Sequence, residues 1–209
     1  MANPWLDVPL SDYEGHMSAP AVGQLDALAD LFAQALAYCR PRSLAILGIA
    51  GGNGLDRIDP AVTARILGID IHPHYLDAVR ARYPALPLTL LCADLQAESL
   101  DIAPVGMVHA ALIFEHAGAG RCLTNALSLV APAGSLSVVL QLPSTTEPGV
   151  SPTPFASIQT LRQHFSLIDP TEFTHRLLTS GFQLTHHRDH QLPGGKAFWL
   201  GIFQRTPSS

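Results

Sequence analysis

Short runs of consecutive apolar residues recur along this chain, and they constrain its fold more than any other feature. Apolar residues at consecutive positions are typical of strands that are buried on both faces. Such strands, when they alternate with helices, form a parallel sheet that is covered on both sides. We expect helices at 21–39, 72–83 and 118–130, and strands at 43–49, 64–71, 88–93, 107–114 and 135–141.

The pattern changes in the last third of the chain. We expect helices at 156–165 and 170–180, followed by strands at 182–191 and 196–205. Only Leu192 to Gly195 separate these two strands, and so short a link joins antiparallel neighbours. The sequence therefore predicts an α/β fold, a three-layer sandwich around a mostly parallel seven-stranded sheet with a C-terminal antiparallel hairpin. We expect a single domain over residues 1–209.

Charge and cysteine content exclude several classes of protein. Charged residues make up 14% of the chain, the formal net charge is -5, and lysine and arginine form no cluster. Proteins that bind a nucleic-acid backbone usually have a basic face, so we expect no nucleic-acid partner. Cys39, Cys92 and Cys122 are too widely spaced for a disulfide framework or a zinc site. The histidines also lack partners at metal-ligand spacing, and we expect no metal.

The sequence does not predict export or membrane insertion. Its first residues lack the basic and apolar segments of a signal peptide. No stretch approaches the roughly 18 apolar residues that a membrane span needs. We therefore expect a soluble, cytoplasmic protein.

A glycine-rich turn, residues 48–54, follows the first expected strand. Ligands of open α/β sheets bind at the carboxyl ends of the strands. A residue without Cβ lets the backbone turn sharply and approach a ligand closely, and Gly48, Gly51, Gly52 and Gly54 supply this freedom. The cluster alone fits an ordinary strand-to-helix turn equally well.

Two aspartates make the pattern more specific. Asp70 ends the second expected strand, about 20 residues past the glycine turn, where an acid accepts hydrogen bonds from ribose hydroxyls. Asp94 ends the third and can accept from an exocyclic amine such as that of adenine. Each aspartate alone would also fit a helix N-cap. Together with the glycine turn, at the ends of three successive strands, they predict a nucleoside pocket.

Two other nucleotide sites do not fit the sequence. The dinucleotide fingerprint G-x-G-x-x-G requires a third glycine where Arg57 stands if it begins at Gly52. If it begins at Gly48, Ala50 occupies the second glycine position. No Gly-Lys-Ser/Thr follows the turn, so a Walker A loop is excluded as well.

From Arg42 to Arg205 the chain resembles the class I S-adenosylmethionine-dependent methyltransferases, which have a Rossmann-like fold. Six segments that resemble family motifs occur in the family's order. They are Leu47–Leu55, Gly68–Pro73, Cys92–Leu95, Ala111–His116, Leu129–Leu136 (with one extra residue before its proline), and the closing hairpin with Phe182–Leu184 and Leu192–Lys196.

The resemblance implies S-adenosylmethionine as the cofactor and S-adenosylhomocysteine as the product. It places Asp70 at the ribose and Asp94 at the adenine, and it places the 111–116 motif beside the transferable methyl group. The cofactor-binding residues that we expect are Gly48, Ile49, Ala50, Gly51, Asn53, Asp70, Ile71, Asp94, Leu95 and Ile113, with Tyr13, His16 and Met17 from the amino-terminal arm, residues 1–20.

The methyl acceptor is expected to be a small molecule, methylated at oxygen, nitrogen or carbon. The chain lacks the Asn-Pro-Pro-Tyr and Pro-Cys motifs that mark relatives acting on amides, adenine or cytosine. Glu115 and His116 are the candidates for a general base, because they directly follow the fourth expected strand. They would equally fit a cap or a solvated loop.

The glycine turn departs from the family pattern. Ile46 stands where the family usually has an acid, and the turn contains one extra residue. We expect backbone carbonyls of the turn or a residue of the amino-terminal arm to replace this acid, with Asp56 as another candidate.

Two segments are candidate covers for the active face. One is the amino-terminal arm, and the other is the lid segment, residues 143–170. Simple docking of the arm on the sheet edge and a flexible connection are the alternatives. For the whole protein, a non-catalytic protein that binds S-adenosylmethionine or S-adenosylhomocysteine stays open as an alternative to a methyltransferase. Aminopropyl transfer is a third, although no acid-rich polyamine pocket is evident.

Overall fold

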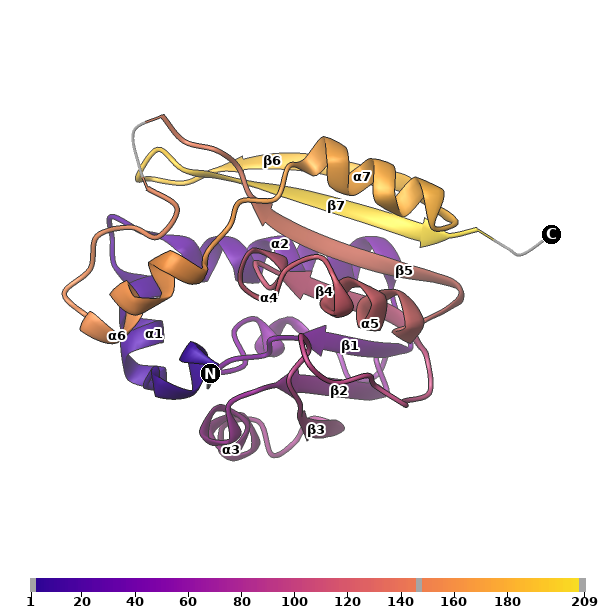
Figure 1. Ribbon diagram of the computed structural model, residues 1–209. Helices are drawn as coiled ribbons and strands as arrows, with labels where there is room; N and C mark the ends of the chain where they lie inside the picture. Colours follow the sequence, from indigo (N-terminus) through magenta and orange to yellow (C-terminus); the bar gives the residue numbers. More distant parts are fainter. Residues whose placement is uncertain (1–2, 146–147, 207–209) are drawn as a thin grey trace.

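The seven strands of the described residues, 3–145 and 148–206, form one sheet in the order β3-β2-β1-β4-β5-β7-β6 in the computed structural model (Figure 1). β1 to β5 are parallel, and β7 runs antiparallel to both β5 and β6. The predicted mostly parallel sheet with a closing hairpin is confirmed. The strands are β1 (Ser43–Leu47), β2 (Arg65–Asp70), β3 (Leu88–Cys92), β4 (Val105–Ala111), β5 (Val130–Gln141), β6 (Phe182–Gln191) and β7 (Ala197–Arg205).

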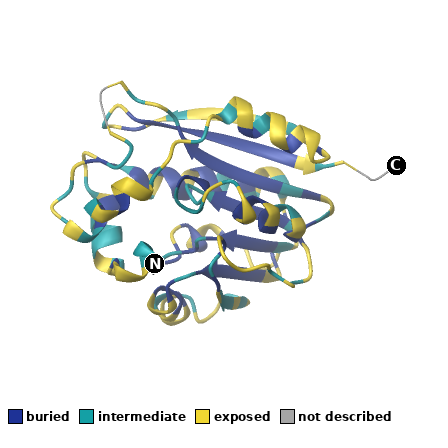
Figure 2. Cartoon of the chain, viewed as in Figure 1, coloured by how far each residue is buried: buried dark blue, intermediate teal, exposed yellow. Residues whose placement is uncertain are grey.

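Helices cover both faces of the sheet, which gives the three predicted layers. α2 (Gln24–Cys39) and α3 (Pro73–Arg82) pack on one face, and α5 (Arg121–Leu129) and α7 (Pro170–Thr179) on the other. Figure 2 shows the central strands of the sheet buried between helices whose outer surfaces are exposed, while the edge strands β3 and β6 are largely half-buried or exposed. No helix in the described part of the chain is long and apolar enough to span a membrane.

β1 illustrates why the apolar runs are continuous. Successive side chains of a strand point to opposite faces. Leu44 and Ile46 therefore pack with α2, whereas Ala45 and Leu47 pack with the residues of α5. Because both faces are covered, every position of the run except Ser43 is apolar and buried.

β4 ends three residues earlier than predicted. Leu112 has a left-handed backbone (φ 54°), which ends the strand, and the chain continues into the short helix α4 (Phe114–Ala117). The apolar run misled the prediction because Phe114 stays fully buried against Phe173, with ring centroids 5.0 Å apart.

Residues 131–134, which separate the expected helix at 118–130 from the expected strand at 135–141, lie inside β5. Val130 pairs with Val105 and Ser135 with Met107, so the extra residues are absorbed by a shift of register. Ala133 takes a left-handed backbone (φ 58°) there. The Pro-Ala-Gly sequence thus deforms the strand without ending it.

The amino-terminal arm has no clear period in sequence, yet it contains the 3-10 helix η1 (Pro4–Asp7) and α1 (Leu10–Ser18). The lid segment is described at 143–145 and 148–170 and contains α6 (Ala156–Thr160) and the 3-10 helix η3 (Leu161–His164). Asp12 of α1 accepts a hydrogen bond from the Ser157 hydroxyl of α6 at 2.6 Å. Figure 1 shows α1 and α6 together at the edge where the parallel strands end.

α7 begins as the sequence predicts. The Asp169 carboxylate accepts the backbone N–H groups of Thr171 and Glu172 at 2.8 and 2.9 Å, which satisfies two donors at the helix start. Beyond the helix, Gly181 has φ 81°, the left-handed conformation that glycine adopts without strain.

Candidate functional site

A cavity opens at the carboxyl ends of the parallel strands, under the amino-terminal arm and the lid segment. Its empty space, with open solvent at the mouth included, is about 1070 Å³. Eleven of the site residues predicted from the sequence line the cavity: Tyr13, His16, Met17, Gly48, Ala50, Asp70, Ile71, Asp94, Leu95, Ile113 and His116.

Four predicted site residues do not line this cavity. Ile49 is buried in the core on the α2 side of the sheet. Gly51 faces Glu14 and Arg82, and the Asn53 amide donates to the Leu25 carbonyl at 2.8 Å. Glu115, the fourth, lies behind the cavity wall.

The glycine turn is fixed to Asp70 by its own backbone. Ala50 has a left-handed backbone (φ 47°), a conformation that costs a non-glycine residue about 1–2 kcal/mol. Its N–H donates to Asp70 Oδ2 at 2.8 Å, and this bond offsets the strain. Gly48 (φ 68°) lies against Ile113, whose Cδ1 would be 2.9 Å from an added Cβ.

Asp70 is held in place and still has acceptor capacity. Its Oδ1 accepts the His72 N–H at 2.9 Å, while Oδ2 takes the Ala50 N–H. A carboxylate offers about four acceptor positions. Burial raises the pKa of Asp70, and backbone hydrogen bonds from His72 and Ala50 oppose that shift. The side chain can therefore accept further hydrogen bonds from a ligand in the cavity.

Asp94 follows β3, the strand beside β2, which ends with Asp70. Its Oδ1 accepts the Gln96 N–H at 2.8 Å, which caps the turn that follows. The Gln96 side chain in turn donates to the His116 carbonyl at 3.0 Å. These contacts connect the loop after β3 to α4, across the mouth of the cavity.

The amino-terminal arm is tied to the glycine turn through Arg82. Glu14 of α1 forms an ion pair with Arg82 of α3, and Arg82 also donates to the Gly51 carbonyl at 3.0 Å. A Cβ on Gly51 would collide with Glu14, so the glycine permits this close approach. On the opposite side of α1, Gly15 admits the ring of Phe155 in the lid segment. α1 thus connects the glycine turn to the lid segment.

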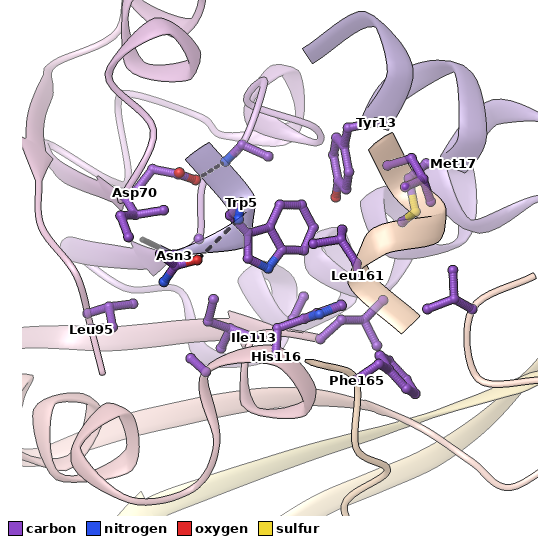
Figure 3. A pocket seen from close by; sticks show the side chains of 18 of the residues that line it. Asn3, Trp5, Tyr13, Met17, Asp70, Leu95, Ile113, His116, Leu161 and Phe165 are labelled. Atoms are coloured by element: carbon purple, nitrogen blue, oxygen red, sulfur yellow. Dashed lines mark hydrogen bonds between the residues drawn. The ribbon is translucent and has the colours of Figure 1, made fainter. Parts of the chain in front are cut away.

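Aromatic rings form a continuous cluster across the cavity. Trp5 of η1 meets His116 edge-on, with ring centroids 4.8 Å apart at 85°, and His116 meets Phe165 at 5.1 Å and 68°. Tyr13 lies 5.9 Å from Trp5 on the other side. Figure 3 shows Trp5 between Tyr13 and His116, with Leu161 and Phe165 beyond.

His116 and Glu115 have different surroundings although they are neighbours in sequence. Burial, with a contribution from nearby His164, lowers the pKa of His116 to about 4, so its ring is neutral at pH 7. The His116 ring forms no hydrogen bond to any residue that the structure describes, and its Nδ1 is buried. Glu115 is 1% exposed, and burial raises its pKa to about 7. Its Oε1 accepts the Gln141 N–H at 2.8 Å.

Polar side chains gather at the far end of the cavity, beyond β5. Lys196, just before β7, donates to the Gly149 carbonyl at 2.7 Å, and Gln141 donates to the same carbonyl at 3.0 Å. Burial and the nearby Lys196 lower the pKa of His16. Gln24, at the start of α2, completes this end of the cavity.

Several lining residues are not among those predicted from the sequence. Trp5 had a usable signal, because an aromatic residue in an arm already expected to cover the site is a candidate for its wall. Ala93, Ala111 and Leu112 belong to the expected motif segments, and the lining residues from Gly149 to Phe165 belong to the expected lid segment. The remaining residues carry no local pattern and meet only through the topology. The missed residues are Asn3, Trp5, Gln24, Tyr75, Ala93, Gln96, Ala111, Leu112, Ala117, Gln141, Gly149, Val150, Ile158, Leu161, Phe165 and Lys196.

Neither Ile46, at the position where an acid is usual, nor Asp56, one of its expected substitutes, lines the cavity. Ile46 is buried in the core beside α2. Asp56 lies largely exposed, 3.3 Å from Arg57, and does not line the cavity. No group of three or more histidine, cysteine, aspartate or glutamate residues in the described part of the chain could hold a metal ion.

No protein-family model matches the sequence, and no curated protein matches it. Solved structures do. The N-methyltransferase NodS from Bradyrhizobium japonicum WM9, in complex with S-adenosylhomocysteine, superposes with a TM-score of 0.71 at 15% identity, over 98% of this chain and 99% of NodS.

Two further structures are similar. An S-adenosylmethionine-dependent methyltransferase from Mesorhizobium loti has a TM-score of 0.65 at 18% identity, over 87% of this chain and 100% of its own. The [4+2]-cyclase SpnF has a TM-score of 0.65 at 12% identity, over 88% of this chain and 82% of its own. At these identities the likeness shows a common fold.

Proposed function

We propose that this chain, which has the Rossmann-like fold of S-adenosylmethionine-dependent methyltransferases, transfers the methyl group of S-adenosylmethionine to a small-molecule acceptor. One observation carries the proposal. The glycine turn, Asp70 and Asp94 follow three neighbouring strands, β1, β2 and β3, and they line a single cavity.

The cavity residues fit the parts of this cofactor. Asp70 would accept hydrogen bonds from the ribose hydroxyls with its remaining lone pairs. Asp94 would accept from the adenine amine, with Ile71, Leu95 and Ile113 as apolar neighbours of the ring. The methionine end would lie at Gly48 and Ala50, under Tyr13, His16 and Met17 of the arm.

The glycine turn favours this nucleoside over a dinucleotide. In dinucleotide-binding folds the pyrophosphate sits at the N-terminus of the helix that follows the glycine turn. Here the turn leads into η2 (Leu55–Arg57), a single 3-10 turn. No α-helix lies between the glycine turn and β2. The site therefore lacks the helix N-terminus that would bind a phosphate.

The residues of the chain position the acceptor and exclude water. When bound, the cofactor supplies a methyl group that its sulfonium already activates. The acceptor's lone pair forms the new bond to the methyl carbon, the carbon–sulfur bond breaks with its electron pair left on sulfur, and the acceptor's proton goes to solvent. Neutral His116 would hold the acceptor by a hydrogen bond. Trp5 and the lid segment would shield the reacting atoms.

Glu115 is the less well placed of the two candidate bases. It is buried behind the cavity wall, and its Oε1 already accepts a backbone hydrogen bond. A group that does not line the cavity cannot reach an acceptor there without rearrangement. We therefore assign the acceptor contact to His116.

Calorimetry with S-adenosylmethionine and S-adenosylhomocysteine tests the proposal, followed by detection of S-adenosylhomocysteine formed over a panel of acceptors. We expect both ligands to bind and at least one acceptor to be methylated. No binding of either ligand at millimolar concentration would contradict the proposal. Binding without turnover over a broad panel would instead favour the non-catalytic alternative.

A further inference from the structure

The order of the strands divides the cavity into two halves. Asp94, Asp70 and Gly48 follow β3, β2 and β1, so under the proposed function the cofactor occupies that half. The other half lies above the ends of β4 and β5 and the start of β7. Its cover is formed by Trp5 and the lid segment.

The walls of this second half are mainly aromatic and aliphatic. The His116 ring meets the rings of Trp5 and Phe165 edge-on, and all three rings line this half of the cavity. Leu161 and Ile158, each 2% exposed, close it from the lid segment. Aromatic walls of this kind favour flat, apolar ligands, because a planar ring gains both burial and aromatic contacts.

The charged side chains that line the cavity further restrict the class of acceptor. Among the described residues that line the cavity, the carboxylates are Asp70 and Asp94, and both belong to the cofactor half. In the second half, burial favours the neutral form of His116, and the basic side chain of Lys196 donates to the Gly149 carbonyl. A cationic amine would find no carboxylate among the described residues of these walls and would lose its hydration.

We propose that the acceptor is a planar aromatic molecule without a positive charge, whose hydroxyl or amino group is methylated while it is hydrogen-bonded to His116. This inference rests on the proposed function. His116 is the polar ring of the three, its Nδ1 is buried, and its ring has no hydrogen-bond partner among the described residues. A ligand hydroxyl or amine would bond to Nε2, which orients the acceptor's nucleophilic atom beside the aromatic walls.

Calorimetry on the full chain saturated with S-adenosylhomocysteine tests the ligand class. The probes share one skeleton: 2-naphthol, its saturated analogue decahydro-2-naphthol and the cation 2-naphthylmethylamine. We expect 2-naphthol to bind about tenfold more tightly than each of the other two. Equal or tighter binding of the saturated or the cationic probe would overturn the inference.

Variants of the aromatic wall residues test whether 2-naphthol binds in this half of the cavity. Trp5→Leu and Phe165→Leu should each weaken 2-naphthol binding by about tenfold, and Phe165→Leu should leave the affinity for S-adenosylhomocysteine within about twofold. Tyr38→Leu is the matched control, since Tyr38 is an exposed aromatic residue (53%) that does not line the cavity. Unchanged 2-naphthol binding in both cavity variants would contradict the inference.

The two proposals fail in different ways. If S-adenosylhomocysteine binds and none of the three probes does, the aromatic acceptor is wrong and the proposed function stands. If S-adenosylhomocysteine does not bind, the proposed function fails first, and 2-naphthol binding to the unliganded chain then reports on the aromatic walls alone.

Discussion

Asp70 shows how much of the candidate site depends on one side chain. Its two oxygens accept backbone N–H groups from the glycine turn and from the start of α3. The carboxylate therefore holds the strained Ala50 in place and faces the cavity at the same time. Under the proposed function, the oxygens that hold the glycine turn and the start of α3 in place would also bind the ribose.

Replacing Asp70 by alanine should weaken the binding of S-adenosylhomocysteine by about 1.5–3 kcal/mol, the usual contribution of hydrogen bonds to a charged group. Calorimetry on the folded variant measures the change. Asp56→Ala is the control, because Asp56 is an exposed acid that lies just beyond the same turn and outside the cavity. Undiminished affinity in Asp70→Ala would mean that the ribose site lies elsewhere.

Glu115 makes a separate prediction about stability and pH. Its pKa is about 7 in the folded chain, above the ordinary value of 4.5. Ionisation of the buried carboxyl therefore costs nothing below pH 4.5 and up to about 3 kcal/mol above pH 7. Stability is lost as the pH rises through this window.

Glu115→Gln removes the ionisation, so between pH 4 and pH 8 its free energy of unfolding should rise relative to that of the parent by up to about 3 kcal/mol. Urea unfolding at the two pH values measures this difference. Glu172→Gln, at an exposed position on α7, should show no such change. A constant difference between Glu115→Gln and the parent would show that Glu115 is not buried as described.

Among the elements, α1 is the one whose role the sequence conceals. Few of its residues are buried in the core, so it shows no helical hydrophobic period. Its fold instead depends on individual partners: Ser157 for Asp12, Arg82 for Glu14 and Phe155 for Gly15. Such long-range pairs leave no local pattern in a single sequence.

Arg82→Ala should loosen α1 without affecting the sheet. The lost ion pair is partly exposed and is worth about 0.5–1 kcal/mol, so amide hydrogen exchange in residues 10–18 should speed up about two- to fivefold. Arg80→Ala is the control on the same helix, because Arg80 pairs with Asp77 and not with the arm. Equal exchange in the two variants would show that Arg82 does not hold α1.

The strands were the most predictable elements, and the irregular ones show the limits. The parallel strands follow from apolar runs and the hairpin from a short link, which are local signals. The end of β4 at Leu112 and the deformation of β5 at Ala133 depend on left-handed backbones, which no apolar pattern encodes. Nor does any apolar pattern predict that Gln24 and Lys196 line the same cavity. α2 and the hairpin bring them there from distant parts of the chain.

At the scale of the whole molecule, buried histidines should make the protein sensitive to acid. His109, 5% exposed in β4, lies against Phe32 and near the Ser137 hydroxyl. Burial lowers its pKa to about 3, as it lowers that of His116 to about 4. Both histidines take up a proton near pH 6.5 only when the chain unfolds, so stability is lost as the pH falls below 6.5. Glu115 has the opposite sign and offsets part of this loss.

His109→Gln should reduce the loss of stability between pH 7 and pH 5 by about 2 kcal/mol, the cost of keeping one histidine neutral 1.5 pH units below its ordinary pKa. Urea unfolding at both pH values provides the measurement. His187→Gln is the control, because His187 is an exposed residue of β6. If the variant loses as much stability as the parent between these pH values, His109 does not contribute to the acid sensitivity.

The placement of Trp5 has an optical consequence. The chain contains two tryptophans. Trp5 lines the cavity, while Trp199 is buried in the sheet beside Phe203, away from it. In a Trp199→Phe variant, fluorescence excited at the red edge of tryptophan absorption would come from Trp5 alone. The emission would then follow ligand entry in real time, and the complementary Trp5→Phe variant would supply a reference signal from the core.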